Sequence, residues 1–170
     1  AFRFANKVMY NQMRYSRWAG TNQRNGGKIP KIEGPTDDYE PEWRLFQLAF
    51  ILLNIESVVN PKSKHRETVD LLWFPTGGGK TEAYLGLTSF TIFLRKIISK
   101  DIKGCAVLMR YTLRLLTTQQ FERAASLICA CEFIRRKNVD LLGEEKISLG
   151  LWIGKESTPN KEKEALDDYN

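Results

Sequence analysis

Residues 69–82 read VDLLWFPTGGGKTE, and this stretch predicts the fold. It joins a short apolar run, Val69–Phe74, to three consecutive glycines and then to Lys80-Thr81 at the start of a helical stretch. The run barely alternates between apolar and polar residues, as expected of a strand buried on both faces of a parallel sheet. A strand, a glycine-rich turn and a helix in this order are the setting of a phosphate-binding loop.

The glycine loop, Phe74–Gly79, is followed directly by two residues whose side chains suit a bound nucleotide. Glycines allow the backbone to curl so that successive N–H groups point at phosphate oxygens, and the helix N-terminus adds a partial positive charge. We expect Lys80 to reach the β- and γ-phosphates of ATP and the Thr81 hydroxyl to bind Mg²⁺. Both residues are the predicted catalytic groups. The predicted ATP contacts in this stretch are Thr76, Gly77, Gly78, Gly79, Lys80, Thr81 and Glu82.

One residue departs from the usual phosphate-loop pattern, which begins with Gly or Ala. Phe74 stands at that position, and Pro75-Thr76-Gly77 supplies the turn in its place. The alternative interpretation is a glycine-rich connection between a strand and a helix that happens to contain Lys-Thr.

The segments around the loop continue the same pattern. Two further strands are predicted at Cys105–Arg110 and Ile147–Ile153, and helices at about residues 41–59, 80–99 and 113–137. Strands that alternate with helices indicate an α/β fold, in which a parallel sheet is flanked by helices. Ligands of such sheets bind at the carboxyl ends of the strands.

The first part of the chain differs from the rest in charge and composition. Residues 1–18 have the spacing of an amphipathic helix, and residues 19–41, rich in Gly, Asn, Lys and Pro, are predicted to be a linker. Residues 1–36 carry seven Lys or Arg and one Glu. We therefore divide the chain into a helical, basic extension with its linker, residues 1–41, and a nucleotide-binding part, residues 42–170.

Composition excludes several classes of protein. The 170 residues are 42% hydrophobic and 27% charged, which is typical of a globular domain. Three cysteines without a CxxC pair and a single histidine predict a cytoplasmic setting and neither a disulfide scaffold nor a zinc site. No apolar run is long enough to span a bilayer. The net charge of +6 permits a nucleic-acid partner without requiring one.

The string Pro75-Thr76-Gly77-Gly78-Gly79-Lys80-Thr81-Glu82 resembles motif I of superfamily 2 helicases, which reads A-P-T-G-x-G-K-T. GTPases and nucleotide kinases seldom carry this Pro-Thr pair before the glycine. The resemblance implies a RecA-like P-loop domain, here incomplete because the chain is expected to be the first part of one lobe of a longer protein.

A second block, Trp43-Arg44-Leu45-Phe46-Gln47, resembles the R-P-[YF]-Q element of the same family, whose glutamine reads the adenine edge. Gln47 is also the one polar side chain between Leu45 and Leu53, so its amide needs a partner if it is buried. The resemblance implies that Gln47 and Arg44 contact ATP. The alternative places Gln47 on the exposed stripe of a helix.

A third block, Thr112-Leu113-Arg114-Leu115-Leu116-Thr117-Thr118-Gln119, resembles motif Ia, P-T-R-x-L-x-x-Q, with its threonine displaced by one position. A turn from strand to helix presents N–H groups and hydroxyls that suit a nucleic-acid phosphate. The predicted nucleic-acid contacts are Arg110, Thr112, Arg114 and Gln119. A capped helix start with a solvated Arg114 is the alternative.

Three longer strings resemble the helicase-type ATPase of DISARM anti-phage defence systems: LLWFPTGGGKTEAYLGL, VLMRYTLRLLTTQQFERA and ISLGLWIGKESTPN. This resemblance covers residues 40–160. It implies a large ATPase that binds nucleic acid, with DNA favoured over RNA, works beside a companion protein and helps to recognise invading phage DNA. The residues themselves do not distinguish DNA from RNA.

The carboxylates that a helicase needs for hydrolysis are not found after a hydrophobic strand. Glu144-Glu145 and Asp167-Asp168 lie in polar segments, so we expect the chain to hold ATP without hydrolysing it efficiently alone. Two functions stay open. One is the ATP-binding lobe of a DNA helicase or translocase that couples hydrolysis to movement on nucleic acid in anti-phage defence. The other is a nucleotide-binding regulatory or assembly module of a defence complex, without turnover by itself.

Overall fold

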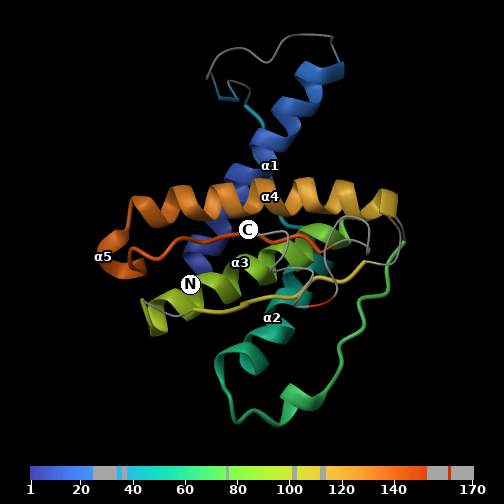
Figure 1. The fold of residues 1–170 in the computed structure, drawn as a ribbon. Helices are drawn as coiled ribbons and strands as arrows, with labels where there is room; N and C mark the ends of the chain where they lie inside the picture. The colour runs from blue at the N-terminus through green and yellow to red at the C-terminus, as the bar shows by residue number, and fades with distance from the viewer. Residues whose placement is uncertain are drawn as a thin grey trace.

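The protein is represented by a computed structural model, which describes residues 1–24, 34–35, 38–75, 77–100, 103–111, 114–152 and 161. Five α-helices are present in these ranges: α1 (Phe2–Arg24), α2 (Leu45–Val59), α3 (Lys80–Ile98), α4 (Arg114–Arg136) and α5 (Val139–Leu142). A short 3-10 helix, η1, spans Lys64–Glu67. Helix α1 packs against both α3 and α4, and α2 packs against α3 (Figure 1).

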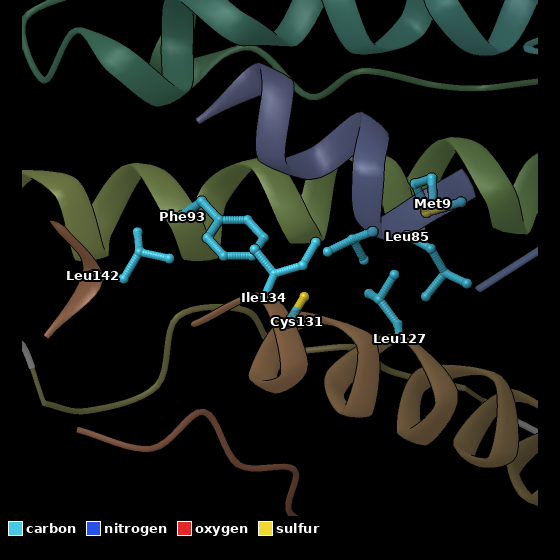
Figure 2. Packing of buried hydrophobic residues seen from close by; sticks show 8 residues of the cluster. Met9, Leu85, Phe93, Leu127, Cys131, Ile134 and Leu142 are labelled. Carbon is cyan, nitrogen blue, oxygen red and sulfur yellow. The ribbon is translucent and has the colours of Figure 1, made fainter. Parts of the chain in front are cut away.

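The hydrophobic core lies where α1, α3 and α4 meet. On α4, Leu127, Cys131 and Ile134 recur at the spacing of one helix face and are almost completely buried. They face Leu85 and Phe93 of α3 (Figure 2). The core is completed by Val8 and Met9 of α1 and Leu142 of α5. Burial raises the pKa of the Cys131 thiol to about 12, so this side chain is a neutral packing group.

The predicted α/β, RecA-like fold is wrong for the part of the chain that the structure describes. That part holds helices and extended segments but neither a strand nor a parallel sheet. The predicted strands correspond to backbone without regular secondary structure at residues 68–75, 103–111 and 146–152, with Ile153 outside the described residues. Figure 1 shows these segments as connections that run past the helices.

The side chains of these segments are exposed, unlike those of a buried strand. Val69, Leu71 and Trp73 are 92%, 86% and 88% exposed, and Leu108 is 87% exposed. A strand covered on both faces would bury such side chains. The helices bury their apolar faces against one another instead, and Val8 and Met9 of α1 take part in this core. A short apolar run does not specify what covers it, and this is the origin of the error.

The helix predictions are confirmed, with changes at their ends. Helix α1 continues through Arg24, into the stretch predicted as a linker. Helix α2 begins at Leu45 rather than near Pro41, and it ends at Val59 as expected. Helices α3 and α4 agree closely with the predicted ranges 80–99 and 113–137. Residues 153–160 and 162–170 lie outside the described residues.

A carboxylate near the end of α4 attaches the extended segment 146–152 to the helices. Glu132 accepts hydrogen bonds from Arg135 Nε and Nη2 at 2.8 and 2.6 Å and from the Ile147 backbone N–H at 3.1 Å. The bond from Arg135 is the main reason that the pKa of Glu132 falls to about 2. Arg135 is itself buried and also donates to the Gly143 carbonyl at 2.7 Å.

The Glu132 contacts predict a pH-dependent stability. Because the folded pKa lies below the unfolded value of 4.5, the stabilisation is fully present above about pH 4.5 and is lost as the pH falls towards 2. At neutral pH, Glu132→Gln should lower the free energy of unfolding by about 1–3 kcal/mol. Urea unfolding of both proteins across this range should show the difference narrowing below about pH 4.5. A difference that stays constant down to the acid limit would contradict this assignment.

Candidate phosphate-binding site

The glycine loop connects the extended segment 68–75 to helix α3. Gly79 occupies the N-cap position of α3 with φ of 91°, in the left-handed region that other residues rarely adopt. Earlier in the loop the Gly78 N–H donates to the Pro75 carbonyl at 3.2 Å and closes a turn. Thr76, a predicted ATP contact, lies outside the described residues. The loop therefore delivers the chain directly into the first turn of α3, where backbone N–H groups lack partners within the helix.

Helix α2 is seated closely against α3 at Gly86. A Cβ atom at this position would lie 2.6 Å from the Trp43 ring and 2.8 Å from the Ile51 side chain, so only glycine fits. Trp43 is held from its other side, since its Nε1 donates to Asn6 Oδ1 of α1 at 2.7 Å. This close approach places the first turn of α2 beside the glycine loop.

Two side chains from the start of α2 bind the carbonyl groups of the loop. Arg44 Nη1 donates to the Gly78 carbonyl at 2.8 Å, and Gln47 Nε2 donates to the Gly79 carbonyl at 2.8 Å. The other end of the Gln47 amide accepts the Arg44 backbone N–H at 2.9 Å, which caps α2. Gln47 is only 3% exposed, so it does not lie on an exposed stripe of the helix. The structure thus brings together the two blocks that the sequence singles out, residues 43–47 and 74–81.

Phe74, which departs from the usual loop pattern, has a packing role. Its ring stacks on Phe46 of α2, with centroids 3.9 Å apart and an interplanar angle of 14°. A glycine or alanine at this position would lack this contact. The aromatic pair therefore attaches the beginning of the loop to the same helix that holds its end.

Lys80, at the first position of α3, folds back over the loop. Its Nζ donates to the Phe74 carbonyl and, at 3.2 Å, to the Pro75 carbonyl. An ammonium group has three donors, so one N–H stays available for an incoming phosphate oxygen. Thr81 follows in the first turn of α3 and is half-buried. One hydroxyl beside a phosphate site is compatible with Mg²⁺, which is commonly held by few protein ligands together with substrate phosphates and water.

Glu82 forms an ion pair that the sequence does not predict. Its carboxylate bonds to Arg123 Nη2 of α4, far along the chain. The predicted role of Glu82 was a contact with ATP, whereas here its charge is neutralised by a protein partner. No motif or spacing points to Arg123, because the pair depends on how α4 packs on α3.

The charges around the loop favour an anion. Arg44 and Lys80 place two cationic groups on the loop, and the carboxylate of Glu82, in the first turn of α3, is paired with Arg123. The N-terminal end of α3 adds its partial positive charge. This set of backbone N–H groups, ammonium and guanidinium is matched to phosphate oxygens.

The residues predicted to contact nucleic acid are only partly described. Arg110 is exposed at the end of segment 103–111, and Gln119 is exposed on α4. Thr112 lies outside the described residues, and Arg114 begins α4 without a described side chain. The nucleic-acid contacts therefore stay a prediction.

Two further searches of the structure bear on metals and membranes. Over the described ranges, no group of three or more His, Cys, Asp or Glu side chains is arranged to hold a metal ion. None of the helices in the same ranges combines the length and apolar character that crossing a membrane requires.

The chain was compared with protein families and with curated proteins. No family model matches this chain. The chain is similar to a DISARM protein. The relative is the DISARM protein DrmA of Bacillus paralicheniformis, with 46% identity over 174 residues. The alignment covers 99% of this chain but only 15% of DrmA.

This similarity confirms the relation to DISARM that the sequence predicts. It runs over nearly the whole chain and so includes both α2 and the glycine loop. The chain spans about 15% of the length of DrmA, so the similarity does not assign the activity of the whole DrmA protein to this chain. The superfamily 2 helicase type stays a prediction.

Proposed function

We propose that this chain is the Mg²⁺·ATP-binding part of a cytoplasmic DISARM-type defence protein that couples ATP hydrolysis to movement on DNA. The observation that carries the proposal is the binding of the loop carbonyls by Arg44, Gln47 and Lys80. The Gly78 N–H closes the turn onto the Pro75 carbonyl. With the carbonyl oxygens of Gly78 and Gly79 held by protein donors, the N–H groups at the start of α3 are left for a phosphate. The similarity to DrmA supports a role in anti-phage defence.

In this proposal the protein groups bind and orient the triphosphate. The Lys80 ammonium approaches the β- and γ-phosphate oxygens, and the Thr81 hydroxyl is a ligand of Mg²⁺. Bound Mg²⁺ neutralises phosphate charge and assists transfer of the terminal phosphoryl group. Hydrolysis needs a carboxylate that can activate water, and the Glu82 carboxylate beside the loop is already paired with Arg123. We therefore assign hydrolysis to the full-length protein rather than to these residues alone.

Replacement of Lys80 tests the nucleotide-binding proposal. Lys80→Ala removes the ammonium group at the loop and should weaken Mg²⁺·ATP binding by at least about tenfold, as expected for a lost charge-assisted hydrogen bond. Calorimetric titration of the full-length protein measures the affinity. Lys62→Ala, an exposed lysine in the loop after α2, is the matched control and should bind like the wild type. Equal affinity of the Lys80→Ala protein and the wild type would show that this loop is not the ATP site.

The proposed DNA contact lies where segment 103–111 leads into α4. Arg110, Thr112, Arg114 and Gln119 are expected to meet backbone phosphates, because a motor has to hold strands of any sequence. A companion protein of the defence complex is part of the same proposal, which rests on the relation to DISARM.

Arg114→Ala in the full-length protein should weaken binding to all DNA sequences alike. It should also reduce the slope of log affinity against log salt by about one, the value expected for one lost phosphate contact. Fluorescence anisotropy at several salt concentrations measures both effects, with Arg66→Ala on η1 as the control. ATP affinity in the absence of DNA should be unchanged. Loss of ATP affinity with unaltered DNA titrations would contradict the contact.

A further inference from the structure

Gln47 directs its amide at the protein backbone rather than at an open site for an adenine base. Its amide nitrogen is bound to the Gly79 carbonyl and its amide oxygen to the Arg44 N–H. With 3% of the residue exposed, neither end of the amide is open to a base. The amide keeps one donor and one acceptor site, but because the residue is buried, an adenine edge could reach them only after the surrounding groups had moved.

The same contacts fix the direction of the N–H groups in the loop. A peptide unit is planar and trans, so the carbonyl of one residue and the N–H of the next point in opposite directions. The Arg44 guanidinium holds the Gly78 carbonyl and thereby orients the Gly79 N–H. Gln47 holds the Gly79 carbonyl and thereby orients the Lys80 N–H.

Consecutive glycines make such external support necessary. Glycine has more backbone freedom than any other residue, and φ is positive at both Gly77 and Gly79. A loop that had to order itself around a phosphate would lose that freedom on binding and would bind more weakly. Two donors supplied by a packed helix hold the loop in place before the ligand arrives.

From this geometry we infer that Arg44 and Gln47 are positioning residues of the glycine loop, which act on recognition of the triphosphate and not of the base. The inference rests on the proposed phosphate-binding function and deepens it. The ligand is a nucleoside triphosphate that the loop holds by its phosphates. Gln47 makes no contact with the base.

The experiment compares three ligands on one set of variants of the full-length protein. Gln47→Met keeps length and apolar packing but removes the amide, and it leaves the charge of the site unchanged. ATP, GTP and inorganic tripolyphosphate, each with Mg²⁺, are titrated into the wild type and the variant. We expect binding of all three to weaken by the same factor, about 3- to 10-fold, because the variant loses the hydrogen bond to the Gly79 carbonyl together with the one from the Arg44 N–H. Asn54→Ala, which removes an amide of α2 that bonds within its own helix, should change nothing.

A local effect on the loop separates positioning from general loss of structure. In the protein without nucleotide, amide hydrogen exchange of peptides covering residues 75–82 should be faster in Gln47→Met than in the wild type, with peptides of α1 and α4 unchanged. Should Gln47→Met fail to fold, Arg44→Met serves in its place, since Arg44 is exposed and its side chain is not part of the core.

The outcomes distinguish this inference from the proposed function. If the wild type binds none of the three ligands, the proposed function itself fails. If Gln47→Met weakens ATP alone and narrows the preference for ATP over GTP, Gln47 reads the base and the inference is overturned. It is also overturned if the folded variant binds all three ligands as tightly as the wild type.

Discussion

The candidate site depends on the contact between α2 and α3 at Gly86. With no side chain at this position, the Trp43 ring and Ile51 lie directly on the backbone of α3. The first turn of α2 is thereby brought within hydrogen-bonding distance of the glycine loop. A larger residue at position 86 would collide with the Trp43 ring and Ile51, so these side chains would have to move and would disturb the alignment of the bonds to the loop.

From this contact follow the shape and the charge of the loop. Phe46 stacks on Phe74 at its beginning, and Gln47 binds the carbonyl at its end. Lys80 closes over the loop from α3, while Arg123 of α4 neutralises the Glu82 carboxylate. Three helices thus contribute to a surface that presents N–H groups and cations to an anion. This surface belongs to a stretch that resembles a DISARM protein along almost its entire length.

The sequence predicts the helices well and their assembly poorly. The periodicity of apolar residues locates α3 and α4 almost to the residue, because it reflects a helix face that has to be buried. The run Val69–Phe74 carries no comparable information, since its composition suits a buried strand but does not say what would cover it. Trp73 is 88% exposed, and the sheet that the run suggests is not formed among the described residues.

The candidate site shows the same limit. Gln47 stands alone among apolar residues, and this isolation correctly signals an amide that needs a buried partner. The identity of that partner, the Gly79 carbonyl, could not be read from the sequence because it depends on how closely α2 approaches α3. Arg123 was missed for the same reason. Long-range pairs of this kind follow from helix packing and leave no spacing pattern in the chain.

The most direct measurement of this account is the Mg²⁺·ATP affinity of Gly86→Ala. The added methyl group would lie 2.6 Å from the Trp43 ring and 2.8 Å from the Ile51 side chain, so it has to displace the side chains that pack α2 on α3. Gly20→Ala is the matched control, because a Cβ at that position of α1 meets nothing within 4 Å. If α2 positions the loop, Gly86→Ala should bind Mg²⁺·ATP about tenfold more weakly or worse while remaining folded, and Gly20→Ala should match the wild type. Unchanged affinity of a folded Gly86→Ala protein would contradict the account.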